Sequence, residues 1–135
     1  KPFRWRDLYA TGIEDIDRQH ERMTRLLNEL QDAFKSGAGR PELSQRWEAL
    51  TQAIAEHFGH EERLMKKYAY PAAESHRREH HALSEQVATF QHRFQAGDEE
   101  LTESVLVFLK DWLRDHLLIS DKRMGDYLRP RRRST

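Results

Sequence analysis

Two pairs of residues in the middle of the chain have the spacing of one helical turn. His57 and Glu61 are four residues apart, and so are His76 and His80. In a helix, side chains at this spacing project from the same face, about one turn apart. Imidazole combined with carboxylate suits iron, manganese or zinc. These four residues are therefore candidate metal ligands, provided that the fold brings them together.

Three further residues extend this set: His20, His116 and Asp121. His116 and Asp121 are five residues apart, which departs from a single helical face by about 140° because each residue turns the helix by about 100°. Asp121 therefore needs a local bulge, a helix end or an extended rotamer to face the same way as His116. The other three of the eight histidines are expected at the surface or beside the site: His60, His81 and His92.

Proline and glycine divide the chain into four amphipathic segments. They cluster at three junctions, near 35–42, 69–74 and 95–100. Between the junctions, apolar residues recur in alternating steps of three and four, which is typical of a helix that buries one face. The sequence predicts helices over 16–36, 42–68, 72–96 and 99–120.

The short junctions predict how these helices are arranged. Consecutive helices with short connections lie antiparallel, so we expect an all-α fold, an up-down-up-down antiparallel four-helix bundle. Asp98 is the expected N-cap of the fourth helix. An N-terminal arm that holds Phe3, Trp5 and Tyr9 precedes the bundle.

This topology brings the candidate ligands to one level. With a rise of about 1.5 Å per residue, alternating helices place them all near one end of the bundle interior. Burying imidazoles and carboxylates there without partners would cost several kcal/mol, on the order expected for buried polar groups. The converging residues are His20, His57, Glu61, His76, His80, His116 and Asp121.

The composition of this set excludes several kinds of metal site. The chain has no cysteine, which rules out disulfides and thiolate ligands. Seven ligands exceed the four of a structural zinc site, and calcium and magnesium prefer oxygen to imidazole nitrogen. The Glu-x-x-His motif of ferritin-type centres and the His-Glu-x-x-His motif of metalloproteases are absent from the sequence. Two metal ions that share bridging carboxylates fit the set.

The overall composition excludes other functional classes. With 135 residues and 23 basic against 23 acidic side chains, the chain predicts one domain with no net field to attract nucleic acid or a membrane. No apolar run could cross a bilayer and no signal peptide is visible, so a cytoplasmic protein is expected. We place the domain at 1–128 and interpret 129–135, RPRRRST, as a solvated basic tail.

The order and spacing of the seven residues resemble the ligand signature of the hemerythrins, in particular bacterial hemerythrin-like domains. The segments TGIEDIDRQH, HFGHEERLM and WLRDHL resemble the family as well, and the resemblance extends from Trp5 to Asp121. It implies a non-haem di-iron centre, bridged by Glu61, Asp121 and an oxo or hydroxo group.

The resemblance also divides the histidines between the two irons. It implies that His76, His80 and His116 bind one iron, and that His20 and His57 bind the other. The iron with fewer histidines would keep an open position where dioxygen binds.

Three apolar residues around His116 occupy the positions that wall the oxygen pocket in the family: Trp112, Leu113 and Leu117. A dry wall protects the oxygenated form from water and protons. The resemblance therefore favours reversible dioxygen binding, as a carrier, store or sensor, and the chain is not expected to be an enzyme. Other small diatomic or anionic molecules are further candidate ligands.

Two alternative functions would use the same ligands. A di-iron redox enzyme would need an acid–base group in the pocket, and the sequence shows none beyond the ligands. A signalling input module would respond to the redox state of the irons or to nitric oxide. The chain's start at Lys1 and its basic end permit a fused or partner signalling domain.

Overall fold

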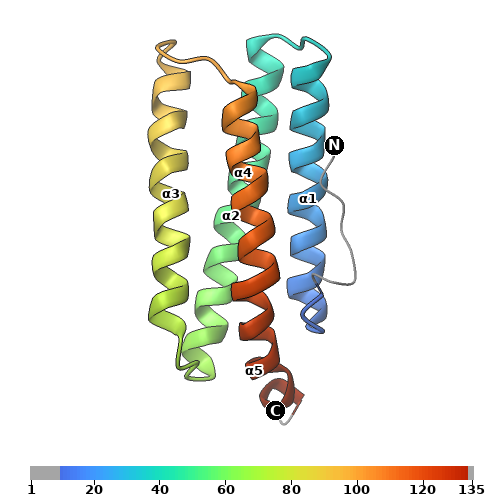
Figure 1. The fold of residues 1–135 in the computed structure, drawn as a ribbon, viewed down its shortest axis with the longest axis vertical. Coiled ribbons are helices and arrows are strands. Elements are labelled where there is room, and N and C mark those ends of the chain that lie inside the picture. The colour runs from blue at the N-terminus through green and yellow to red at the C-terminus, as the bar shows by residue number, and fades with distance from the viewer. Residues whose placement is uncertain (1–9, 134–135) are drawn as a thin grey trace.

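The computed structural model describes residues 10–133, and within this range the regular elements are helices. In Figure 1 they run alternately up and down, as expected for an antiparallel four-helix bundle. The expected arm with Phe3, Trp5 and Tyr9 lies outside the described residues. None of the helices described is long and apolar enough to span a membrane. The four bundle helices are α1 (Glu14–Lys35), α2 (Arg40–Lys67), α3 (Ala73–Gln95) and α4 (Glu103–Asp115).

The first three helices begin and end within two residues of the predicted positions, because local signals fix their ends. Pro41 lies in the first turn of α2, where its missing N–H breaks no helical hydrogen bond. Gly37 and Gly97 follow α1 and α3 with positive φ angles of 78° and 82°. Glycine adopts this conformation without the steric cost that a Cβ imposes, so it commonly ends helices.

The start of the fourth helix differs from the prediction. Thr102 is the N-cap, and its hydroxyl accepts a hydrogen bond from the backbone N–H of Val105 at 3.3 Å. Asp98 instead belongs to the end of α3, where its backbone N–H donates to the carbonyl of Arg93 at 2.9 Å. Leu101 is buried in the bundle interior, and residues 99–101 lie in the connection rather than in a helix.

The fourth helix also does not end near residue 120 as predicted. It continues through a six-residue π-helical segment, η2 (His116–Asp121), into α5 (Lys122–Arg133). Met124 and Leu128 are fully buried, so α5 has an apolar face that packs over the end of the bundle.

Residues 129–133, which we interpreted as part of a solvated basic tail, continue the helix α5. Arg129 donates to the carbonyl of Thr11. Both terminal nitrogens of Arg132 donate to Asp15, at 2.8 and 3.1 Å. Residues 134–135 lie outside the described range, and the domain boundary at 128 stays a prediction.

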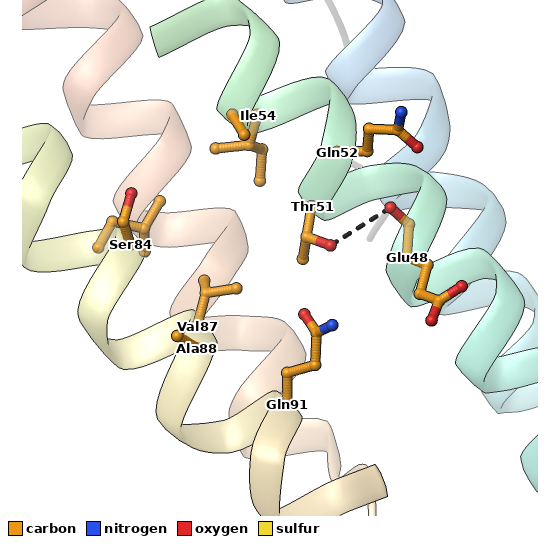
Figure 2. Close-up of a pocket in the computed structure, with 10 residues that line it drawn as sticks. Glu48, Thr51, Gln52, Ile54, Ser84, Val87, Ala88 and Gln91 are labelled. Atoms are coloured by element: carbon orange, nitrogen blue, oxygen red, sulfur yellow. Dashed lines mark hydrogen bonds between the residues drawn. The ribbon is translucent and has the colours of Figure 1, made fainter. Parts of the chain in front are cut away.

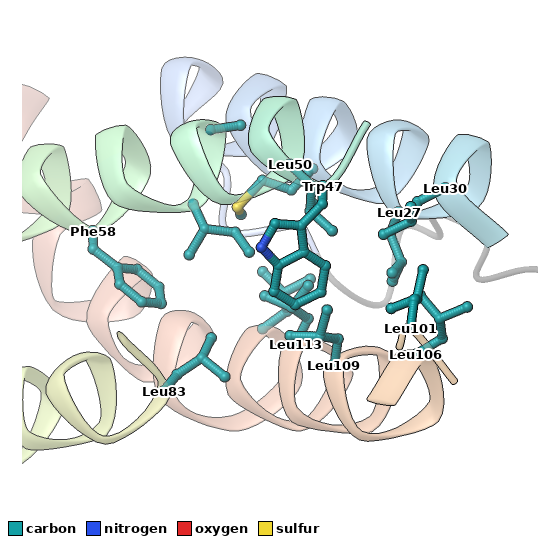
Figure 3. Packing of buried hydrophobic residues seen from close by; sticks show 14 of the residues in the cluster. Leu27, Leu30, Trp47, Leu50, Phe58, Leu83, Leu101, Leu106, Leu109 and Leu113 are labelled. Atoms are coloured by element: carbon teal, nitrogen blue, oxygen red, sulfur yellow. The ribbon is translucent and has the colours of Figure 1, made fainter. Parts of the chain in front are cut away.

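The interior contains two apolar clusters with a polar layer between them. The larger one surrounds Trp47 and Leu50 and fills the half of the bundle shown in Figure 3. The indole N–H of Trp47 donates to the side-chain oxygen of Gln91 at 3.2 Å, which satisfies the one polar atom of that ring. The smaller cluster closes the opposite end of the bundle with Ile13, Ile16, Leu64, Met65, Met124 and Leu128. The candidate ligands lie between the two clusters along each helix.

A groove follows the junction of α2 and α3 in the larger apolar half (Figure 2). Its rim carries amide and hydroxyl side chains such as Gln52, Gln91 and Thr51, and the Thr51 hydroxyl donates to the backbone carbonyl of Glu48 at 3.3 Å. None of the seven candidate ligands lines this groove.

Candidate metal centre

The seven predicted side chains meet in the polar layer, and none is more than 4% exposed. α1 contributes one of them, α2 and α3 contribute two each, and η2, which continues α4, contributes two. Their ligand atoms form two overlapping groups, and within each group all the atoms lie within 4.8 Å of one another. One group contains Glu61, His76, His80, His116 and Asp121. The other contains His20, His57, Glu61 and Asp121.

We call the group with His76, His80 and His116 the three-histidine half, and the group with His20 and His57 the two-histidine half. The two shared carboxylates present a different oxygen to each half. In the two-histidine half, Oδ2 of Asp121 lies 2.8 Å from Nε2 of His20, and Oε2 of Glu61 lies 3.1 Å from Nε2 of His57. Oδ1 of Asp121 and Oε1 of Glu61 face the other half instead. Each carboxylate therefore spans the two groups in the way that a bridging ligand does.

The three-histidine half has the same short spacings. Nε2 of His76 and Nε2 of His116 each lie 3.0 Å from Oδ1 of Asp121. Nε2 of His80 lies 3.0 Å from Oε1 of Glu61. Two atoms bound at right angles to one metal ion, each at about 2.1 Å, are roughly 3 Å apart. The ligand atoms thus already have the separations of neighbouring positions around a metal ion.

Hydrogen bonding within the protein leaves part of this site unsatisfied. Among the described residues, no hydrogen bond of good geometry reaches Oε2 of Glu61 or either oxygen of Asp121. Nε2 of His20 and Nε2 of His57 face each other at 2.9 Å, and such a pair can share only one proton. Since buried carboxylates need a positive partner, the residues fit a pair of metal ions.

The charges of the site support this fit. Burial lowers the pKa of His57, but the charge of Glu61 and the contact with Asp121 outweigh it and raise that pKa to about 9. Burial likewise lowers the pKa of His76, yet its contacts with Asp121 and Glu61 raise it to about 9. Although burial alone would raise them, the carboxyl pKa values of Glu61 and Asp121 stay well below their ordinary values beside the imidazoles. Protons and metal ions therefore compete for the same nitrogens.

The π-helical segment η2 explains how Asp121 reaches the site. Its hydrogen bonds run from residue i to i+5, so a residue five positions on returns below the first. His116 and Asp121 begin and end this segment, and both are buried in the site. The local bulge that the five-residue spacing required is therefore present.

Three ligand histidines are also held through their second ring nitrogen, Nδ1. Nδ1 of His57 donates to Oε1 of Gln19 at 2.7 Å. Nδ1 of His80 donates to Oε2 of Glu62 at 3.0 Å, and Nδ1 of His116 donates to Oε1 of Glu79 at 2.7 Å. These bonds place the proton on Nδ1, which leaves Nε2 free to bind a metal.

The sequence reasoning did not identify Gln19 and Glu79 as part of the site. A signal was available, because each of them directly precedes a ligand in the chain, before His20 and His80. A residue beside an inward-facing ligand is turned by about 100° around the helix, toward the neighbouring helix. It can therefore support a ligand on that helix.

The predicted pocket residues separate into two groups. Leu113 and Leu117 line a narrow, almost wholly apolar pocket, too tight to admit a water molecule, together with Met23, Thr24 and Leu27 of α1. Trp112 does not line this pocket. Its ring stacks on His116 instead, at 4.6 Å between centroids and 17° between planes. The pocket therefore adjoins His20 through the next turn of α1.

The remaining histidines stay outside the cluster, as expected. Nε2 of His60 contacts Oδ2 of Asp15 at 2.8 Å, below the site. His81 is exposed and pairs with Glu85 at 3.1 Å. His92 is exposed on α3.

Comparisons with known proteins agree with this geometry. Residues 11–128 match the Hemerythrin HHE cation binding domain family. The chain is 31% identical to a bacteriohemerythrin of Stenotrophomonas maltophilia over 125 residues, which cover 93% of this chain and 80% of that protein. It is 32% identical to the bacteriohemerythrin of Methylococcus capsulatus over 120 residues, 89% of this chain and 91% of that one.

A solved structure gives the same result. The crystal structure of a wild-type hemerythrin superposes with a TM-score of 0.90 at 30% identity, covering 95% of this chain and 98% of that one. The family match spans most of the chain and includes all seven clustered residues. The chain therefore belongs to the hemerythrin family, and it is a non-haem di-iron protein that binds dioxygen and is not an enzyme.

Proposed function

We propose that Glu61 and Asp121 bridge two irons that the histidines hold unequally. His76, His80 and His116 would bind one iron, and His20 and His57 the other. This assignment rests mainly on the positions of the carboxylate oxygens. Each carboxylate places one oxygen near the histidines of one half and the other oxygen near those of the other half.

The two-histidine half offers fewer protein ligands, so an iron held there would keep a position for a small molecule. The iron pair would supply the electrons with which dioxygen is reversibly held. Met23, Leu27, Leu113 and Leu117 line the adjoining pocket and keep water from it. Thr24, the one polar residue of that wall, donates its hydroxyl to the carbonyl of His20 at 2.9 Å. Its proton is therefore turned away from the pocket.

The proposal is tested by loading the protein with ferrous iron without oxygen and counting the irons bound per chain. Visible spectra are then recorded before oxygen is added, after its addition and after its removal. Two irons and an absorption band that appears with oxygen and disappears when oxygen is removed support reversible binding. A band that decays to a permanently ferric spectrum would contradict reversible binding, and a chain that binds no iron would contradict the di-iron assignment.

A sensor role is a second candidate, and the connection from Asp121 to α5 favours it. Asp121 ends η2 and α5 begins at the next residue, Lys122. α5 in turn is fastened to the start of the bundle through Arg132 and Asp15. A change at the irons that moves Asp121 would therefore act directly on α5. Hydrogen exchange of α5 in the ferrous and ferric proteins tests this role, and equal exchange rates would argue against it.

The finer details of partners and location stay predictions. These are binding of other small diatomic or anionic ligands, a fused or partner signalling domain, no association with nucleic acid, and a cytoplasmic location. A titration of the ferric protein with azide, followed by its visible spectrum, tests the first of them. An unchanged spectrum would limit the site to dioxygen.

A further inference from the structure

The residues that accept hydrogen bonds from the ligand histidines follow one rule along the chain. Each acceptor is the chain neighbour of a ligand on its own helix, and it supports a ligand on the next helix. Gln19 on α1 accepts from His57 on α2, at 2.7 Å. Glu62 on α2 accepts from His80 on α3, at 3.0 Å.

Glu79 on α3 completes this series, because it accepts from His116 at 2.7 Å. The same oxygen of Glu79 also accepts the hydroxyl proton of Ser120 at 2.6 Å. Since Ser120 lies within η2, Glu79 fixes both the ring of His116 and the backbone segment that carries it.

The acceptors differ in charge between the two halves of the site. In the three-histidine half, both observed acceptors are carboxylates, Glu62 and Glu79. Their side chains are 38% and 43% exposed, so water still solvates their charge. In the two-histidine half, the acceptor for His57 is the neutral amide of Gln19.

This difference has a direct electronic consequence. An imidazole whose Nδ1–H donates to a carboxylate is a more basic ligand than one whose Nδ1–H donates to an amide. A more basic ligand stabilises ferric over ferrous iron, and hydrogen bonds to ligands are a recognised means of setting the reduction potential of iron centres. Glu62 and Glu79 therefore favour ferric iron in the three-histidine half more than Gln19 does in the two-histidine half. The unequal number of histidines acts in the same direction.

We infer that Gln19, Glu62 and Glu79 are positioning residues that make the two irons differ in reduction potential. The carboxylates lower the potential of the three-histidine iron, while Gln19 keeps the potential of the ligand-binding iron higher. This inference rests on the proposed di-iron function. It gives the neutral side chain at position 19 a specific role, which is to limit the loss of electrons from the iron that faces the apolar pocket.

The test replaces a carboxylate by an amide in one half and an amide by a carboxylate in the other, without changing the size of the side chain. Glu79→Gln removes the carboxylate from His116, and Gln19→Glu adds one to His57. The one-electron potentials of the iron-loaded full-length proteins are measured by spectroelectrochemical titration. Exchangeable histidine N–H resonances are recorded by paramagnetic NMR, because a merely structural role would not shift a single ligand's proton.

Matched controls make the same charge changes away from the ligand histidines. Glu85→Gln removes an exposed carboxylate of α3 that pairs with His81. Gln52→Glu adds a carboxylate at an exposed position of α2. Both controls report the effect of net charge alone.

Glu79→Gln is expected to favour the ferrous state of the three-histidine iron about tenfold, which raises its potential by about 59 mV for one electron. Gln19→Glu is expected to lower the potential of the other iron by a similar amount. Each change narrows the difference between the reduction potentials of the two irons. In the controls, the ferric-to-ferrous ratio of each iron should change by less than about twofold.

Iron counting separates the possible failures. If the wild type binds two irons and the gap stays unchanged in both variants, or changes as much in the controls, the inference is overturned while the di-iron function stands. If the wild type does not bind two irons, both are overturned. Should Glu79→Gln bind less iron than the wild type, Glu62→Gln provides the same comparison through His80.

Discussion

The two halves of the metal centre share their carboxylates but have different surroundings. The two-histidine half adjoins an aliphatic wall that includes Met23 and Leu117. The three-histidine half is packed against aromatic rings, with Phe58 stacked on His80 at 3.8 Å and Trp112 on His116 at 4.6 Å. One half has fewer histidines and an aliphatic wall, and the other is filled with aromatic side chains that stack on its ligands. The comparison shows how one pair of bridges can serve a binding half and a supporting half.

The largest expected effect comes from removing a bridging carboxylate, because both halves of the metal centre depend on it. Asp121→Asn keeps the size of the side chain but removes its charge and one of the two oxygens that face the halves. We expect bound iron to fall from two per chain to one or none, measured by metal analysis after gel filtration. Asp126→Asn, an exposed change in α5, is the control. Retention of two irons by the Asp121 variant would rule out the bridge.

The pH dependence of iron loading tests whether the two halves compete with protons equally. His57 and His76 belong to different halves, and the neighbouring carboxylates outweigh burial to raise the pKa of each to about 9. Below pH 9 each histidine must release a proton to bind iron. Affinity should therefore fall by about tenfold per pH unit for each proton displaced.

Competition with a chelator between about pH 6 and 8 measures this dependence for both irons. The carboxyl pKa values of Glu61 and Asp121 lie well below this range, so these groups stay ionised throughout and do not contribute. A loading curve that does not move with pH would contradict the proton competition. A slope found for only one iron would show that the halves differ in this respect.

Opening the aliphatic wall tests the difference between the halves, because among the described residues this wall adjoins the two-histidine half. Leu113→Ser brings a hydroxyl and water toward the pocket, and we expect the oxygenated form to decay about tenfold faster, as the loss of a water-excluding contact predicts. Leu109→Ser is the matched control. It changes an equally buried leucine one turn earlier in α4 that does not line the pocket. Equal decay rates in the two variants would show that this wall does not protect the oxygenated form.

The smallest effect concerns the ion pair below both halves. Arg132 holds Asp15, which also contacts His60. Burial raises the pKa of Asp15, but the bonds from Arg132 and His60 outweigh it and lower that pKa below 3.8. Because a lowered pKa stabilises the fold only while the carboxyl is ionised, this contribution is present above pH 3.8 and is lost as the pH falls below it.

Arg132→Ala should therefore reduce the free energy of unfolding by about 0.5 kcal/mol at neutral pH, because solvent screens this partly exposed pair. Denaturant unfolding of the iron-free protein measures this change, with the exposed Arg25→Ala as control. The difference from wild type should shrink in acid, as the pH falls further below 3.8. A difference that persists there would assign the effect to packing rather than to charge.

The sequence predicted the seven clustered residues because their chemistry conflicts with their position. The inward face of an amphipathic helix is normally apolar. A histidine or carboxylate there, such as His57 or Glu61, therefore indicates a functional site. Bundle topology then brings such residues to one level. The first three helices were predictable for a related reason, since residues such as Pro41 and Gly97 mark their ends locally.

The parts that were missed depend on contacts between distant segments. Neither Asp98 nor Thr102 shows from its own type which of them caps α4, because both residue types suit that position and the course of the connection places Thr102 there. The helical course of residues 129–133 depends on contacts of Arg129 and Arg132 with the start of the chain. The sequence likewise does not show that Trp112 stacks on His116, because an amphipathic pattern does not fix the direction of a single ring.

The most direct test of the unequal halves is the Mössbauer spectrum of the oxygenated protein, loaded with isotope-enriched iron. The two bridges, the different histidine counts and the pocket on one side predict two quadrupole doublets of equal area, one for each iron. A single doublet from two irons would show that their environments are equivalent, and a single iron per chain would show that the carboxylates do not bridge. Either result would contradict the account.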